Sequence, residues 1–220
     1  MEHANIGTAQ HAVSADAQKV LRNTYMLLSM TLVFSAVTAG ISMALNLPQG
    51  AALVLMLVGF GLIFAVNATA DSGKGIVMIF AFTGVMGAAL GPMLNHYLAL
   101  PNGPMLVMQA LAGTALVFFT LSGYALTTRK DFSFMGGFLM TGLIVIVIAS
   151  LANIFFAIPA VSLAISAAAV MIMSGLILFD TSRIIHGGET NYIRATISLY
   201  LSIYNLFVHL LSLLGIMGDD

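Results

Sequence analysis

The sequence predicts an all-α polytopic membrane protein, with seven transmembrane helices and the C-terminal helix central. Three observations predict this fold class. The chain of 220 residues is 60% hydrophobic and only 7% charged, whereas soluble domains carry about 25% charged residues. Seven apolar runs follow one another, each near the ~20 residues that cross the hydrocarbon core. None shows the period-two alternation of barrel strands, and an open sheet cannot satisfy its backbone in lipid.

The predicted spans are separated by short connections. The apolar runs cover residues 25–45, 50–67, 76–98, 105–127, 134–156, 161–182 and 195–217. Residues 1–22 precede them and are mixed polar, which predicts a mobile cytosolic tail rather than a cleaved signal peptide. Residues 23–220 are then expected to form a single seven-helix transmembrane domain.

All seven basic residues fall on the same side of this topology. They precede the first run or lie between the second and third, the fourth and fifth, or the sixth and seventh runs: Lys19, Arg22, Lys74, Arg129, Lys130, Arg183 and Arg194. The other three connections carry no Lys or Arg. Because basic loops are retained in the cytosol, the N-terminus is predicted to be cytosolic. Seven spans then place the C-terminus outside.

The last run carries five polar residues at helical spacing. Ser198, Ser202, Asn205, His209 and Ser212 are four, three, four and three residues apart. On a helix these positions share a stripe roughly 80° wide. A polar stripe on a membrane helix faces protein or water rather than lipid. The stripe therefore predicts that the last helix is packed inside the bundle.

Asp180 is the only acidic residue well inside a predicted span. A carboxylate near the bilayer centre costs about 2.5–3.5 kcal/mol, so we expect Asp180 to face the stripe. The predicted polar core is Asp180, Ser198, Ser202, Asn205 and His209. One interpretation is a proton- or cation-sensitive gate, and the other is a structural hydrogen bond with Arg183 nearby. Asp180 is a weak candidate for a metal ligand, because hard cations take several oxygens.

A short polar hinge separates the last two runs. It consists of His186, Gly187, Gly188 and Glu189, followed by Thr190 and Asn191. We expect a tight turn, with Thr190 or Asn191 capping the last helix. The hinge is not a zinc signature, because H-E-x-x-H is missing.

Other motifs that carry chemistry are absent from the sequence. There is no G-x-S-x-G, P-loop or dinucleotide fingerprint. The chain contains no cysteine, and its formal net charge is −1. We therefore expect no enzymatic activity, no cofactor, no firm metal site and no nucleic-acid partner.

Segments of the chain closely resemble the signature of the Bax-inhibitor family. They are Phe179-Asp180-Thr181, Ile184-Ile185-His186, Glu189, Tyr192-Ile193, Ser198-Leu199-Tyr200-Leu201 and Asn205-Leu206-Phe207, with Lys130-Asp131-Phe132-Ser133-Phe134 and Gly91-Pro92-Met93-Leu94-Asn95-His96-Tyr97. The chain looks most like the bacterial YccA-like branch of this family. The resemblance implies a seven-helix fold with a central last helix, in the bacterial cytoplasmic (inner) membrane.

The same resemblance implies a function. Members of this branch are modulators of the membrane-bound AAA protease FtsH, which implies an FtsH-type protease complex as a partner besides the lipid bilayer. The cytosolic tail offers a segment that such a protease can engage.

The alternative is a pH-sensitive calcium or proton leak channel gated at Asp180, with Ca²⁺ or H⁺ as the transported ion. It follows from relatives that are calcium leaks controlled by two aspartates on the sixth and seventh helices. Asp180 matches the first aspartate, but Ser202 stands at the second position. Residues 50–67 also lack the basic residue that those relatives use.

Overall fold

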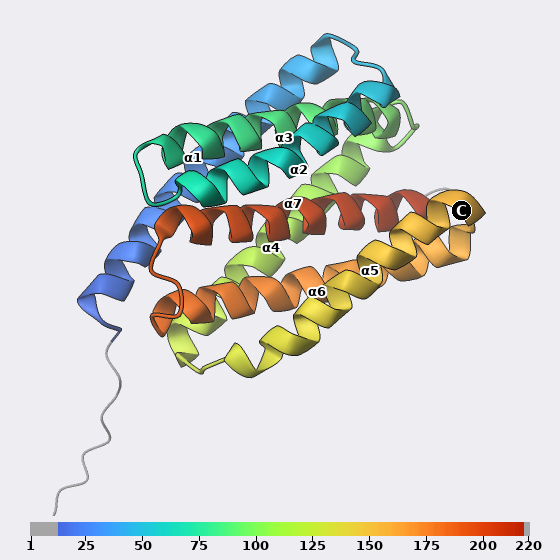
Figure 1. The fold of residues 1–220 in the computed structure, drawn as a ribbon. Coiled ribbons are helices and arrows are strands. Elements are labelled where there is room, and N and C mark those ends of the chain that lie inside the picture. Colours follow the sequence, from blue (N-terminus) through green and yellow to red (C-terminus); the bar gives the residue numbers. More distant parts are fainter. Residues whose placement is uncertain (1–12, 218–220) are drawn as a thin grey trace, which may run out of the picture.

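The computed structural model describes residues 13–217, and every regular element in that range is helical (Figure 1). All seven α-helices of this range are long and apolar enough to cross a membrane, which confirms the predicted fold class. In order, the elements are α1 (Ala15–Ala44), α2 (Gln49–Thr69), α3 (Lys74–Leu98), α4 (Gly103–Thr128), the 3₁₀ turn η1 (Ser133–Met135), α5 (Gly136–Phe156), α6 (Pro159–Ile185) and α7 (Tyr192–Met217).

Helix α7 lies at the centre of the bundle. Figure 1 shows it between α2 and α3 on one side and α5 and α6 on the other, with α4 running diagonally behind it. It packs against α6, α4 and α1, and also contacts α3 and α2. Half of the α7 span is buried inside the protein, whereas 11% of the α2 and α5 spans is buried. The central position predicted for the last helix is therefore confirmed.

Helices α1 and α3 approach each other closely because small residues line their contact. A Cβ atom added at Gly87 would clash with the carbonyl oxygen of Ser35, and one added at Gly91 would clash with the hydroxyl of Ser42. Ser42 instead donates a hydrogen bond of 2.7 Å to the carbonyl oxygen of Ala88. Small residues commonly allow such close packing of membrane helices, where no hydrophobic force draws the helices together.

Helix α1 begins ten residues before the first predicted span. The hydroxyl of Ser14 accepts a hydrogen bond of 3.1 Å from the backbone N–H of Ala17 and so caps the helix. Residues 15–22, predicted to belong to the tail, are therefore helical. They escaped the hydropathy pattern because Ala, Gln, Lys and Arg favour a helix without being apolar enough to mark a span. Residues 1–12 of the predicted tail lie outside the described part of the chain.

The basic residues gather at one end of the bundle, which is called the basic end below. They lie in the second and third turns of α1, in the first turns of α3 and α7, after α4 and at the end of α6. This arrangement follows from the sequence, in which connections with Lys or Arg alternate with connections that have neither. The members of the basic end are Lys19, Arg22, Lys74, Arg129, Lys130, Arg183 and Arg194.

Candidate functional site

The hinge between α6 and α7 is a compact turn at the basic end. Helix α6 finishes with two backbone hydrogen bonds, from Gly188 N to Arg183 O at 2.8 Å and from Gly187 N to Ile184 O at 3.2 Å. Together they form a Schellman motif, which needs a left-handed residue after the cap. Gly187 occupies that position with a φ of 74°, a conformation that glycine adopts without strain.

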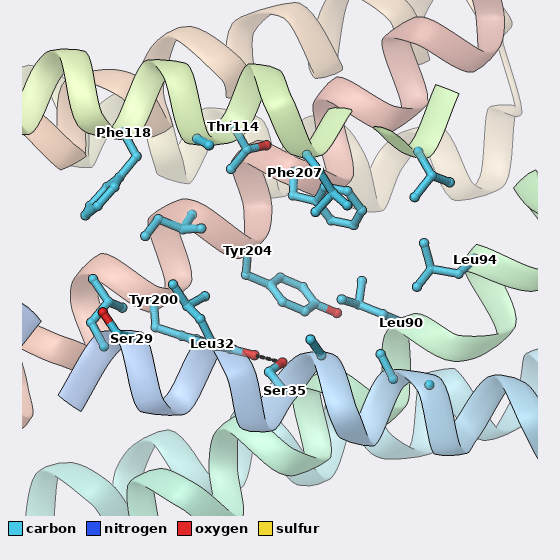
Figure 2. Close-up of a pocket in the computed structure, with 18 of the residues that line it drawn as sticks. Ser29, Leu32, Ser35, Leu90, Leu94, Thr114, Phe118, Tyr200, Tyr204 and Phe207 are labelled. Atoms are coloured by element: carbon cyan, nitrogen blue, oxygen red, sulfur yellow. Dashed lines mark hydrogen bonds between the residues drawn. The ribbon is translucent and has the colours of Figure 1, made fainter. Parts of the chain in front are cut away.

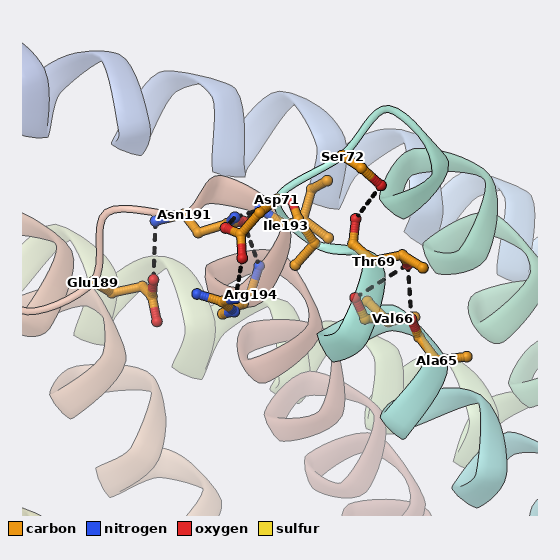
Figure 3. Close-up of polar contacts among 10 residues, drawn as sticks. Ala65, Val66, Thr69, Asp71, Ser72, Glu189, Asn191, Ile193 and Arg194 are labelled. Atoms are coloured by element: carbon orange, nitrogen blue, oxygen red, sulfur yellow. Dashed lines mark hydrogen bonds and ion pairs between the residues drawn. The ribbon is translucent and has the colours of Figure 1, made fainter.

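Asn191 caps α7 and ties the hinge to the α2–α3 turn (Figure 3). Its side-chain oxygen accepts hydrogen bonds from the backbone N–H groups of Ile193 and Arg194, at 2.8 and 3.2 Å. Its amide group donates to Ala70 O at 3.0 Å and to the Asp71 carboxylate at 2.8 Å. Arg194 forms an ion pair with the same Asp71. Of the two candidate caps, the structure selects Asn191.

Glu189 and Arg183 close the other side of the hinge. One carboxylate oxygen of Glu189 accepts from the backbone N–H of Asn191 at 2.9 Å, and the other lies 3.7 Å from the Arg183 guanidinium. Arg183 also donates to Gly188 O at 3.2 Å and stacks over the ring of Phe179. The guanidinium is thus engaged by the hinge rather than hydrogen-bonded to Asp180.

His186 joins the hinge to the connection between α4 and η1. Its Nε2 lies 3.1 Å from the carbonyl oxygen of Arg129, to which only an N–H can donate. Ser182, one turn earlier, donates to Lys130 O at 3.2 Å. In the same connection Asp131 accepts a hydrogen bond of 2.8 Å from Ser133 N. The hydrogen bonds from Ser133 hold the pKa of the Asp131 carboxyl below its usual range.

Asp180 is buried in α6 and faces α7. Its side chain accepts a hydrogen bond of 2.5 Å from the hydroxyl of Ser198, and only 6% of the residue is exposed. Ser202 is buried one turn farther along α7, and among the hydrogen bonds of the described residues none joins it to Asp180. The carboxylate therefore meets the polar stripe at Ser198, the residue of the stripe nearest the basic end.

The remaining stripe residues make separate contacts. Asn205 donates to the carbonyl oxygen of Leu201 in its own helix, at 2.8 Å. The His209 ring lies 3.3 Å from the hydroxyl of Ser166 in α6, which lies 3.5 Å from the Ser212 hydroxyl. His209, Ser166 and Ser212 line a cavity of about 370 Å³ near the end of the bundle opposite the basic end. The predicted polar core is thus two clusters along the α6–α7 contact rather than one.

The α6–α7 segment and the segments around it match a known family over nearly the whole chain. The family is described as "Inhibitor of apoptosis-promoting Bax1", and its profile matches residues 17–219. The chain belongs to the Bax-inhibitor family.

Within the Bax-inhibitor family, several relatives share more than half of their residues with this chain. "Modulator of FtsH protease YccA" from Escherichia coli K12 is 59% identical over 203 residues, which cover 92% of each chain. An uncharacterized membrane protein of Vibrio cholerae is 54% identical over 206 residues, 93% of this chain and 92% of the relative. An uncharacterized protein of Pseudomonas aeruginosa is 51% identical over 209 residues, 95% and 94% of the two chains.

The residues around Asp180 can be compared with the cation site that the leak-channel alternative requires. Asp180 stands alone as a carboxylate at the α6–α7 contact, with a serine hydroxyl as its partner. Among residues 13–217, no group of three or more His, Cys, Asp and Glu side chains lies close enough together to hold a metal ion. The described side chains therefore build no cluster of several acidic oxygens, which hard cations prefer.

The sequence did not predict two hydrogen bonds between residues far apart in the chain. Asp71 is 120 residues away from Asn191 in the chain, and its place in a polar connection gave no sign of that partner. Tyr200 hydrogen-bonds through its hydroxyl to the hydroxyl of Ser35 at 2.7 Å, yet it lies outside the polar stripe. A tyrosine in the middle of a span was the available signal, because a buried Tyr hydroxyl usually finds a partner.

Proposed function

We propose that this protein is an inner-membrane regulator that binds and modulates an FtsH-type membrane protease. One observation carries the proposal: 59% identity over 92% of both chains with the "Modulator of FtsH protease YccA". A further relative, from Escherichia coli O6:H1, is named "Inner membrane protein YccA". These names describe a modulator and a membrane protein, which agrees with a non-enzymatic role.

The basic end is the side on which we place the protease contact. Basic connections are retained in the cytosol, so the basic end and the start of α1 face the compartment that supplies ATP to the protease. Helix α1 is capped at Ser14, and residues 1–12 precede that cap. In this proposal an ATP-driven protease engages residues 1–12, which precede a helix that starts on the cytosolic side.

Co-purification tests the proposal directly. A tagged copy of the full chain, extracted from the membrane in mild detergent, is expected to carry the protease complex with it. A tagged copy of another seven-helix membrane protein of similar abundance serves as the control. If no more protease co-purifies with this chain than with the control protein, the proposed function is refuted.

A second experiment tests the role of the first twelve residues. Deleting residues 1–12 keeps the Ser14 cap and α1, and is expected to slow degradation of this chain by the protease while co-purification persists. A variant in which residues 2–12 are replaced by a Gly/Ser segment of equal length separates the effect of sequence from that of length. Unchanged degradation of the deletion variant would remove the first twelve residues from the mechanism without touching the regulator proposal.

The leak channel gated at Asp180 is not favoured. Two of the relatives are named as a modulator of FtsH protease and as an inner membrane protein, and the second position of the aspartate pair is Ser202. Flux of Ca²⁺ or H⁺ into proteoliposomes at two pH values distinguishes the two functions. A flux that Asp180→Asn abolishes would support the channel.

A further inference from the structure

A second cavity, on the other side of α7 from Asp180, lies between α1 and α4 (Figure 2). Its volume is about 650 Å³, within the range of small-molecule sites. Apart from the contacts of Tyr25 with Ser122 and Phe118, helices α1 and α4 do not approach each other, so the cavity opens sideways between them. Exposed residues of both helices form its rims, including Ala36, Gly40, Leu111 and Phe119. In a membrane this opening faces lipid.

The cavity is long and narrow. On α1 its lining runs from Tyr25 to Met43, which is roughly 27 Å at 1.5 Å per residue and close to the ~30 Å of the hydrocarbon core. A single hydrocarbon chain fits a cavity of this volume.

One polar atom in the wall of the cavity has no partner. Tyr204 is 7% exposed, and its hydroxyl is buried without a hydrogen bond from any described residue. The neighbouring lining tyrosines are satisfied, because Tyr200 contacts Ser35 and Tyr25 contacts Ser122, both at 2.7 Å. Figure 2 shows the Tyr204 ring projecting from α7 into the space between α1 and α4. Buried hydroxyls are rarely left unpaired, so this one points to an oxygen supplied from outside the chain.

We propose that this cavity binds one neutral single-chain lipophile from the bilayer, an unbranched hydrocarbon chain with an uncharged hydroxyl or carboxyl group that hydrogen-bonds to Tyr204. The ligand is neutral because none of the residues lining the cavity is charged. Tyr204 is the thirteenth of the 26 residues of α7, so its hydroxyl lies near the bilayer centre. The ester groups of phospholipids lie at the edge of the hydrocarbon core, roughly 15 Å away.

Tryptophan quenching tests this binding, because the chain contains no tryptophan of its own. Phe118→Trp places one fluorophore in the cavity lining, and Phe64→Trp places one on the exposed surface of α2. The probe is dibrominated octadecanol added to the protein in lipid nanodiscs. We expect saturable quenching of the reporter at position 118 and only non-saturable partitioning at position 64. Non-saturable quenching at both positions would overturn the proposal.

The role of the Tyr204 hydroxyl is tested in the Phe118→Trp background. Tyr204→Phe keeps the ring and removes the oxygen, so it is expected to weaken binding of dibrominated octadecanol about two- to tenfold, the value of one hydrogen bond. Binding of dibrominated octadecane, which has no oxygen, should not change. An equal loss for both probes would assign Tyr204 a packing role and refute the hydrogen bond.

A blocking variant completes the test. A Cβ added at Gly40 meets no atom within 4 Å, so Gly40→Phe is expected to fill the cavity without disturbing the backbone and to abolish saturable quenching by both probes. Gly61→Phe is the matched control, since Gly61 on α2 is equally unobstructed and lines no part of the cavity. Unaltered quenching in Gly40→Phe would show that the hydrocarbon probes bind elsewhere and would overturn the proposal.

Discussion

The two faces of α7 hold the bundle together in different ways. One face is the polar stripe, which meets α6 through the Ser198–Asp180 hydrogen bond near the basic end and the His209–Ser166 contact near the other end. The opposite face is aromatic and aliphatic and is directed to α1, α3 and α4. It carries Tyr200, Ile203, Tyr204, Phe207 and Leu211, positions that a period of 100° per residue centres roughly opposite the stripe.

The polar face sets how α6 aligns with α7, whereas the aromatic face supplies most of the packing contacts. Inside a bilayer the helices gain no hydrophobic force from lipid, so they associate through van der Waals contacts and hydrogen bonds. The polar face fixes the register of α6 against α7 at a few points, each of modest energy. The aromatic face makes many more van der Waals contacts, yet it leaves the cavity between α1 and α4 unfilled. We therefore expect the larger losses of stability on the aromatic face.

The largest effect is expected at Tyr200. Tyr200→Ala removes a ring that is 1% exposed and packs edge-on against Phe82, and should lower the free energy of unfolding by about 3–5 kcal/mol. Tyr200→Phe removes only the hydroxyl, which hydrogen-bonds to Ser35 and donates to the carbonyl oxygen of Thr83 at 3.4 Å, and should cost about 1 kcal/mol. Tyr124→Ala, at a position 45% exposed, is the control and should cost far less than Tyr200→Ala. Unfolding by SDS in mixed micelles measures all three.

A smaller loss is expected where the polar face meets Asp180. Ser198→Ala removes the donor to the carboxylate and should cost about 1.5 kcal/mol. In an Asp180→Asn background the acceptor becomes neutral, and the same change should cost about 0.6 kcal/mol, typical of hydrogen bonds between membrane helices. Ser174→Ala is the control, because Ser174 bonds only within α6. Equal costs in both backgrounds would show that the negative charge of Asp180 adds nothing.

The smallest effect is expected at the other end of the polar face. Ser166→Ala removes the hydroxyl near His209 and Ser212 and should cost about 0.6 kcal/mol. Ser150→Ala, which breaks only a bond within α5, should leave stability unchanged. If Ser166→Ala costs more than Ser198→Ala in the same unfolding assay, the ranking along the stripe is wrong.

The sequence alone determined the number of spans and the central position of α7. Both depend on local properties that are visible in one dimension: an apolar length that matches the bilayer, and a polar stripe at the helical period. The basic residues were assigned to one end for the same reason, because successive connections lie on alternate sides of the membrane. The hinge was also local, because a Gly-Gly pair with Thr190 and Asn191 shortly after it predicts a helix end and a new cap at one of these two residues.

Only the tertiary structure decided which distant residues meet. Asn191 finds Asp71 across the basic end, and Tyr200 finds Ser35 across 165 residues. The stripe indicated a face of α7 but not the rotation of α6, so only Ser198, and neither Ser202 nor Asn205, hydrogen-bonds to Asp180. The gap between α1 and α4 arises from the packing of four helices. No single segment encodes it, because a cavity is defined by side chains that come from different parts of the chain.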